Sequence, residues 1–173
     1  MLKDLIRKDI EEKEGVKFNA YLCSSGVATI GAGFTWLFTD YGTRKVKLTD
    51  VMTKEQYEIE IAKKVDYYLD IVKHLVTIDL NDNQLRALVS FVYNFGGNRF
   101  KSSTLLKKIN AGQSIDFNGT LNSQALEYYK SKGVTQLTEF HRWVFEGGEW
   151  TGNRGSQGLA NRRIWESNLY KKK

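Results

Sequence analysis

The chain has 173 residues, of which 41% are apolar and 13% aromatic, enough to build one packed core or two tightly joined lobes. A single cysteine excludes an intramolecular disulfide, and the first thirty residues lack the long apolar stretch of a signal peptide or membrane-spanning helix. The net charge of +6 favours an anionic partner, which could be nucleic acid, lipid or a cell envelope.

The N-terminal part of the chain predicts one helix followed by strands. Apolar residues recur at helical spacing over residues 2–13, and the helix should end near Gly15, which places Glu14 at its C-terminal end. That end of a helix disfavours a negative charge, so a carboxyl group there is helped to keep its proton. From 18 to 47, short runs of aromatic and β-branched residues broken by glycines predict a small antiparallel sheet.

Helical patterns account for the rest of the chain. Thr53 and Gln56 form a capping-box pattern ahead of a helix over about 54–74, and Asn81 with Gln84 repeats that pattern ahead of the next helix. Further helices are predicted over residues 103–110, 122–132, 135–145 and 158–170, with a long glycine-rich loop over 147–158.

Three polar residues near the predicted sheet form a candidate catalytic group: Glu14, Cys23 and Thr29. Cleavage of a glycosidic bond needs one group to protonate the leaving oxygen and another to position or activate water. The spacing alone is equally compatible with a purely structural role for each of these residues. The glutamate can be a solvated surface residue, the cysteine a small buried side chain, and the threonine a residue favoured in strands.

The arrangement E-x8-C-x5-T, followed by Ile30-Gly31-Ala32-Gly33, resembles the signature of phage lysozymes of the T4-type and lambdoid endolysin family, glycoside hydrolase family 24. The similarity continues through residues 80–112. It resumes at Phe140-His141-Arg142-Trp143 and over residues 158–163, so it covers nearly the whole chain. Phe34 departs from the family, in which histidine commonly follows the second glycine.

The resemblance implies an α+β, lysozyme-like fold in a single catalytic domain over 1–173. A small β-containing N-terminal lobe of about 1–55 would be joined by a helix of about 54–74 to a larger helical C-terminal lobe of about 75–173, with a cleft between them. The implied function is that of a phage endolysin, a muramidase that hydrolyses the β-1,4 bond between N-acetylmuramic acid and N-acetylglucosamine in peptidoglycan and so lyses the host cell.

The same resemblance implies the catalytic roles. Glu14 would be the general acid, while Cys23 and Thr29 would position or activate water. Cys23 stands where much of the family has aspartate. Its thiol could be a base with a depressed pKa, a water-positioning group or a nucleophile, because an ordinary thiol is mostly protonated at neutral pH.

Five residues are candidates for substrate binding. The backbone at Gly31 could approach a sugar closely, and Asn94 could hydrogen-bond an acetamido group. Arg142, Trp143 and Arg162 match the family less securely. A guanidinium could pair with a carboxylate of the peptide stem, and the structural alternatives are a core tryptophan and an intramolecular ion pair.

We expect no cofactor and no metal, because two histidines and one cysteine stand at no recognised ligand spacing. Gly31 and Gly33 lack the third glycine, helix and distal acid of a dinucleotide site. The expected partner is bacterial peptidoglycan, bound by a monomer without stable membrane insertion. No nucleic-acid-binding motif supports a nucleic-acid partner.

Two alternatives keep the same fold: a catalytically impaired peptidoglycan-binding module, or a lytic transglycosylase that forms an anhydro sugar without water. Since the chain shows no signal peptide, we expect accumulation in the host cytoplasm before holin-dependent release to the cell wall or periplasm.

Overall fold

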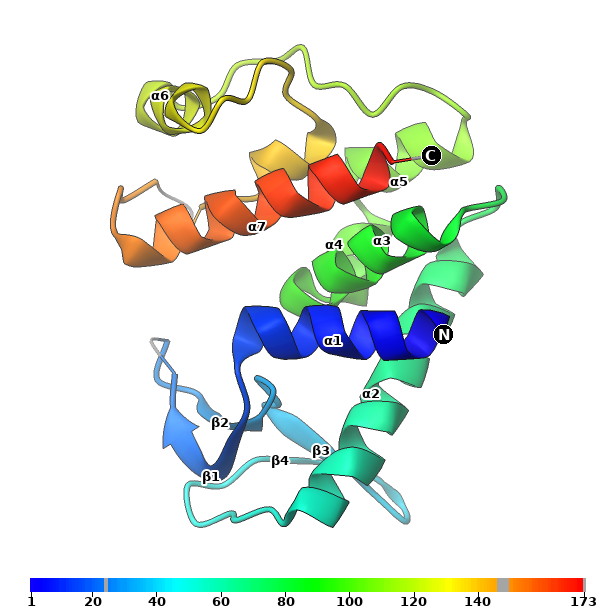
Figure 1. Cartoon of the computed structure of the whole chain (residues 1–173), viewed down its shortest axis with the longest axis vertical. Coiled ribbons are helices and arrows are strands. Elements are labelled where there is room, and N and C mark those ends of the chain that lie inside the picture. The colour runs from blue at the N-terminus through cyan, green and yellow to red at the C-terminus, as the bar shows by residue number, and fades with distance from the viewer. Residues whose placement is uncertain (24, 146–149, 173) are drawn as a thin grey trace. The chain divides into compact units, whose positions relative to one another are not determined.

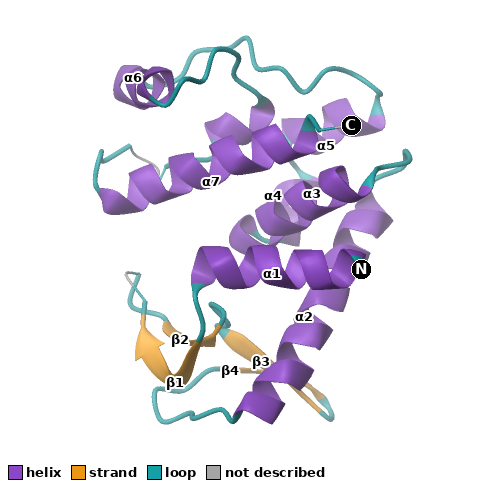
Figure 2. Ribbon diagram, viewed as in Figure 1, coloured by secondary structure: helices purple, strands orange, loops and turns teal. Residues whose placement is uncertain are grey.

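The computed structural model describes residues 1–23, 25–145 and 150–172 and divides into two compact units, Met1–Asp70 and Ile71–Lys173 (Figure 1). The four strands all lie in the first unit, while the second is built on helices (Figure 2). The α+β class predicted from the sequence is therefore confirmed. Among the described residues, no helix has the length and apolar character needed to span a bilayer.

The first unit contains one helix, two hairpins and the first part of a long helix. Its elements are α1 (Leu2–Glu14), β1 (Lys17–Leu22), β2 (Ala28–Gly31), β3 (Trp36–Thr39), β4 (Gly42–Lys45) and α2 (Lys54–Leu75), which continues into the second unit. The strands pair as two separate antiparallel hairpins, β1 with β2 and β3 with β4, rather than as one sheet. In the first hairpin, Tyr21 lies opposite Thr29.

Two-stranded hairpins are marginally stable alone, so their apolar side chains must be covered by helices. Ile10 from α1, Ile30 from β2 and Ile61 from α2 are all almost fully buried. Phe34, just after β2, stacks on Tyr57 of α2 with ring centroids 5.8 Å apart. Burying each such side chain contributes about 1.5–3 kcal/mol, which fixes the hairpins on the unit's own helices.

The second unit consists of α3 (Asp82–Phe95), α4 (Gly97–Lys101), α5 (Thr104–Asn110), α6 (Ser123–Ser131), the 3-10 helix η1 (Glu139–Arg142) and α7 (Arg154–Tyr170). Its centre is the packing of α3 against α7, which run side by side (Figure 1). Phe91 of α3 and Phe140 of η1 are fully buried there, with ring centroids 5.5 Å apart.

Both predicted capping boxes are present. The backbone N–H of Gln56 donates to Thr53 Oγ1 at 3.1 Å, and the Thr53 N–H donates to the Gln56 side chain at 2.8 Å. Asn81 and Gln84 make the same reciprocal pair ahead of α3, at 2.9 Å in both directions. These bonds satisfy donors that the first helical turn leaves open, which explains why α2 and α3 begin close to the positions expected from the sequence.

The predicted helix over 135–145 is wrong, because only Glu139–Arg142 is helical. Thr138 is extended, with φ −123° and ψ 171°, and forms an isolated antiparallel bridge with Asp116. Backbone bonds on either side of it, from Phe117 N to Leu137 O at 3.0 Å and from Glu139 N to Ile115 O at 2.8 Å, hold this extended conformation. Pairing with a distant segment therefore overrides the helical pattern.

The predicted loop over 147–158 is too long at its C-terminal end. Residues 147–149 lie outside the described residues, but α7 already begins at Arg154 rather than at Gly158. Asn153 caps this helix, since its Oδ1 accepts the backbone N–H of Ser156 at 2.9 Å. The cap outweighs the low helix propensity of Gly155 in the first turn.

Candidate active site

Glu14 is the last residue of α1, and its side chain is half-buried against the loop after β2. Helix α1 ends there because Gly15 has a φ of 68° and its N–H donates back to Glu11 O at 2.9 Å. A Cβ placed on Gly33 would lie 3.0 Å from Glu14 Oε2, so the carboxyl group rests directly on the Gly33 backbone. The absence of a side chain at Gly33 is what admits the carboxyl group.

Cys23 follows β1 at the start of a tight turn. Its backbone N–H donates to Val27 O at 3.0 Å, and its carbonyl accepts the N–H of Gly26 at 2.9 Å. The half-buried Sγ atom lies 3.0 Å from Ser25 Oγ. The two backbone bonds thus fix the main chain of Cys23.

The pKa of the Cys23 thiol is lowered to about 7, chiefly by its hydrogen bond to Ser25. Burial opposes this shift, while the backbone amides of Val27 and Ser25 and the hydroxyl of Thr29 act in the same direction as Ser25. Hydrogen bonds to the charged form of a group favour that form. About half of the thiol is therefore ionised at neutral pH, where an unperturbed thiol would be a few per cent ionised.

Thr29 lies in β2 with only 3% of its surface exposed. Its hydroxyl donates to Val27 O at 3.0 Å, which leaves the lone pairs of the oxygen able to accept a hydrogen bond. Because Val27 O also accepts the N–H of Cys23, the hydroxyl of Thr29 and the thiol turn are tied to one carbonyl group.

Tyr21 connects the three predicted catalytic residues. It lies opposite Thr29 in the hairpin, and burial raises the pKa of Tyr21 with further contributions from the charges of Glu14 and Cys23. Lys17 Nζ lies 4.0 Å from the centre of the Tyr21 ring. Glu14 and Cys23 thus lie close enough to influence the charge of Tyr21, and Thr29 lies opposite it in the same hairpin.

A second tyrosine, Tyr68 of α2, also lies near the acid. Burial raises the pKa of Tyr68 to about 12, and the charge of Glu14 contributes to that rise. No role is predicted from the sequence for either tyrosine. For Tyr21 a signal existed, because it is two residues from Cys23 in an alternating strand and so shares a face with it.

Gly31 is buried, with a φ of 63°, and a Cβ there would collide with the ring of Phe34. The fold itself therefore explains why this position needs glycine. Phe34, the residue that departs from the family pattern, is 2% exposed and belongs to the core of the first unit. Any contact between Gly31 and a sugar stays a prediction.

The second unit contains a cavity of about 730 Å³ that includes two of the predicted binding residues, Arg142 and Trp143. Arg99 adds a second guanidinium to its wall, and Phe95 and Phe145 add aromatic rings. Such a lining combines positive charge with flat apolar surface. It suits a ligand that carries a carboxylate next to apolar groups.

Arg142 is 44% exposed and keeps a hydrogen bond of 3.1 Å from Nη1 to Glu139 Oε2. Glu139 also pairs with Lys108 at 2.7 Å, so Arg142 shares its carboxylate with a second cation. Trp143 is half-buried and packs edge-on against Phe95, with ring centroids 5.2 Å apart. Both residues therefore make contacts within the protein, and both also line the cavity.

Asn94 is exposed near the end of α3, and its Oδ1 accepts a hydrogen bond of 2.8 Å from Arg163 Nη2. This bond fixes the orientation of the Asn94 amide and occupies its oxygen as an acceptor. The Nδ2 group is the part of Asn94 able to donate to a carbonyl oxygen of a ligand.

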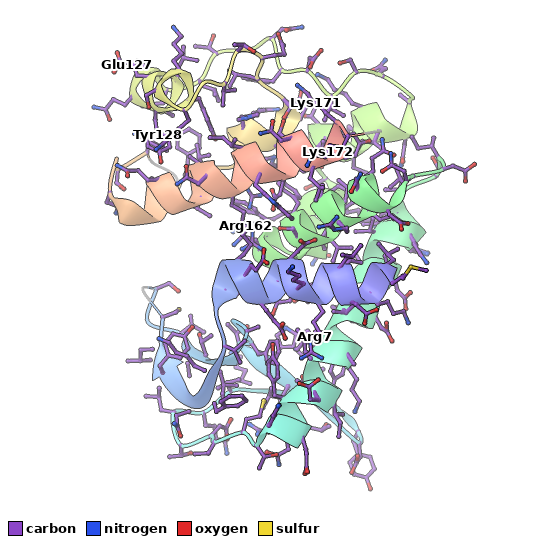
Figure 3. All side chains as sticks on the ribbon, in the orientation of Figure 1. Arg7, Glu127, Tyr128, Arg162, Lys171 and Lys172 are labelled. Carbon is purple, nitrogen blue, oxygen red and sulfur yellow. The ribbon has the colours of Figure 1, made fainter. Side chains whose placement is uncertain are left out.

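Arg162 lies in the interior of the second unit, and its part in substrate binding stays a prediction. It points from α7 with 8% of its side chain exposed (labelled in Figure 3), and its Nη2 donates to Ser90 O at 3.2 Å. Its Nε lies 3.3 Å from Glu166 Oε1. This is the intramolecular ion pair that the sequence left open as the alternative.

Comparison with known proteins agrees with the fold. Residues 11–137 match the model of the phage lysozyme family. An endolysin of Acyrthosiphon pisum secondary endosymbiont phage 1 is 31% identical over 123 residues, which cover 71% of this chain and 76% of that protein. An endolysin of Bacillus phage PZA is 31% identical over 163 residues, which cover 93% of this chain but 51% of that relative, so the chain spans about half of its length.

Among solved structures, an endolysin from Escherichia coli O157:H7 phage FAHEc1 superposes with a TM-score of 0.70 and 26% sequence identity, covering 99% of this chain and 93% of that one. The lysozyme-like fold expected from the sequence is thereby confirmed. The family match also includes Glu14, Cys23 and Thr29, the residues that surround Tyr21. The chain belongs to the phage lysozyme family.

Proposed function

We propose that the protein is a phage endolysin that acts as a muramidase, hydrolysing the β-1,4 bond between N-acetylmuramic acid and N-acetylglucosamine in bacterial peptidoglycan. Membership of the phage lysozyme family gives the broad class, a glycosidase-type lysozyme. The observation that carries the specific reaction is the grouping of a carboxyl group, an ionisable thiol and a hydroxyl around Tyr21.

In this proposal Glu14 is the general acid. It gives its proton to the glycosidic oxygen as the bond to the anomeric carbon breaks, and the departing sugar leaves as an alcohol. Water attacks the anomeric carbon from the opposite face and loses a proton to the Cys23 thiolate. The hydroxyl of Thr29 accepts a hydrogen bond from that water, because its own proton is directed to Val27 O. The product is inverted at the anomeric carbon.

The lowered pKa of Cys23 supports a base rather than an inert thiol. A pair of variants tests this role: Cys23→Asp supplies a carboxylate base, while Cys23→Ser supplies a hydroxyl of similar size that does not ionise near neutral pH. We expect activity in Cys23→Asp and a loss of about a hundredfold in Cys23→Ser, the usual range for one general base. Equal activity in both variants would exclude a catalytic role for the thiol.

The cavity in the second unit supports a proposal for substrate contacts. Arg142 would pair with a carboxylate of the peptide stem, and Trp143 would present its ring to an apolar part of the substrate. Asn94 would donate through Nδ2 to an acetamido oxygen, while the Gly31 backbone would allow a sugar to approach closely. Arg162, predicted for the same set, pairs with Glu166 inside the second unit.

A lytic transglycosylase and a non-catalytic peptidoglycan-binding module remain the alternatives to be tested. Mass spectrometry of the products from purified peptidoglycan separates all three. Hydrolysis gives a reducing muramic acid end that is one water heavier than the 1,6-anhydro product of a transglycosylase, and a binding module gives no new ends. The partly ionised thiol favours the first outcome, because a transglycosylase has no water to activate.

The proposal also includes the biological setting. The substrate is an anionic polymer in an anionic envelope, which suits a chain of net charge +6. We propose that a monomer accumulates in the host cytoplasm, is released with the help of a holin, and lyses the cell from the cell wall or periplasm.

A further inference from the structure

Ser25 makes a specific contact with the thiol of the candidate active site. The turn that begins at Cys23 places Ser25 Oγ 3.0 Å from Cys23 Sγ. Two backbone bonds hold this turn, from Cys23 N to Val27 O and from Gly26 N to Cys23 O. These bonds place the backbone of Cys23 so that the exposed side chain of Ser25 can reach the sulfur.

The direction of this hydrogen bond follows from the protons available. A thiolate has no proton, so when Cys23 is ionised Ser25 must donate to the sulfur. Thr29, the other hydroxyl that influences the thiol, already donates its proton to Val27 O at 3.0 Å. The hydroxyl of Thr29 also lowers the pKa of the thiol, but its contribution is smaller than that of Ser25.

The charged groups around the thiol do not by themselves favour a thiolate. Every contribution that lowers the pKa of Cys23 is a hydrogen bond, from Ser25, Val27 or Thr29. Lys17 is a compensating cation, but its ammonium group lies over the Tyr21 ring, 4.0 Å from the ring centre. Ionisation of Cys23 therefore depends on hydrogen-bond donors, and the Ser25 hydroxyl makes the largest contribution to lowering the pKa of the thiol.

We propose that Ser25 is a positioning residue that keeps Cys23 in the ionised form needed to activate water. The assignment rests on the proposed function where it gives the thiolate a part in hydrolysis. Ser25 itself does not touch the reacting atoms, because it acts through the sulfur of Cys23.

The test compares Ser25→Ala with Ser25→Thr, which keeps the hydroxyl. Cys23 is the single cysteine of the chain, so the rate of alkylation by iodoacetamide across a pH series reports this one thiolate without any substrate. We expect the rate at pH 7 to fall about fivefold or more in Ser25→Ala and to stay within about twofold of the wild type in Ser25→Thr, because a bond to a charged group moves an ionisation by about one pH unit or more. Thermal melting confirms that each variant is folded.

The second measurement is the pH dependence of peptidoglycan hydrolysis. The acid limb of the profile should move to higher pH in Ser25→Ala and remain in place in Ser25→Thr, a shift that a purely structural role would not cause. Alkylation profiles that are the same in Ser25→Ala and the wild type would overturn the proposal, and so would a shifted alkylation profile with an unmoved acid limb. A wild type that alkylates as expected but has no hydrolytic activity would instead refute the proposed function.

Discussion

At the scale of single residues, Gly33 controls the space occupied by the carboxyl group of Glu14. Its φ of +80° is a conformation that side chains other than glycine adopt with strain, and a Cβ there would lie 3.0 Å from Glu14 Oε2. Gly133 has almost the same φ, +76°, but a Cβ there would meet nothing within 4 Å. The two glycines form a matched pair that separates backbone strain from contact with the acid.

We predict that Gly33→Ala and Gly133→Ala each lower the free energy of unfolding by about 1–2 kcal/mol, because each forces alanine into the left-handed region. Only Gly33→Ala should also lower peptidoglycan hydrolysis, by about tenfold, since a displaced acid is misaligned with the bond. Urea unfolding measures the first effect and dye release from labelled peptidoglycan the second. A similar loss of activity in Gly133→Ala would show that strain alone is responsible.

His141 is a buried residue with a direct effect on pH stability. It is 2% exposed, and burial lowers the pKa of His141 to about 4, helped by the charges of Lys171 and Arg163. The Thr138 N–H donates to Nδ1 at 2.9 Å, so the neutral ring carries its proton on Nε2. Between about pH 6.5 and pH 4 the unfolded chain therefore binds more protons at this residue than the folded chain does, and stability falls as pH falls.

From this pKa we predict that proton binding to His141 in the unfolded chain lowers the free energy of unfolding by about 2 kcal/mol between pH 7 and pH 5. His141→Gln should be less stable than the wild type at pH 7 but should lose correspondingly less on acidification. His74→Gln serves as the control, because His74 is exposed on α2. Urea unfolding at the two pH values measures all three proteins, and equal losses in wild type and His141→Gln would contradict the prediction.

At the scale of elements, α3 and α7 are joined by a buried cluster of charges. Glu166 of α7 is fully buried and lies between Arg162, at 3.3 Å, and Arg163, at 3.2 Å. Ser90 of α3 donates its hydroxyl to Glu166 Oε1 at 2.7 Å. Since Arg163 also holds Asn94, the cluster links the helix packing to a proposed substrate contact.

We predict that Glu166→Gln lowers the free energy of unfolding by about 3–5 kcal/mol, because it leaves two buried guanidinium groups without a compensating charge. Glu127→Gln is the control, since Glu127 extends outward from α6 and is exposed (Figure 3). That variant should change stability by less than about 0.5 kcal/mol. Guanidinium chloride would screen charges, so urea unfolding is the suitable measurement, and similar stabilities for the two variants would refute the structural role of the cluster.

The elements also show what could be predicted from the sequence. Helix starts at α2 and α3 were predictable because capping boxes act within four residues of the chain. The bridge between Thr138 and Asp116 was not, because it joins segments that meet only after folding. Likewise, the contact of Arg162 with Ser90 joins two helices distant in the chain, whereas its pairing with Glu166 is an ordinary i,i+4 pattern.

At the scale of the whole molecule, the family pattern identified Glu14, Cys23 and Thr29 because they lie within sixteen residues and one hairpin brings the last two together. The contacts around these residues could not be predicted from the sequence. Ser25 acts through a turn geometry and Gly33 through the rotamer of a neighbouring side chain, and both require coordinates. Motifs thus predict candidate reacting groups, while the immediate partners of these groups depend on the folded backbone.

The most direct test of the account is the release of reducing sugar from purified Gram-negative peptidoglycan by the wild type and by Glu14→Gln, after circular dichroism has shown that both are folded. The account predicts clear release by the wild type and a loss of at least about a hundredfold in the variant, the lower range for removing a general acid. Release that is equal in the two proteins, or absent from the wild type, would contradict the assignment of this chain as a muramidase that uses Glu14 as its acid.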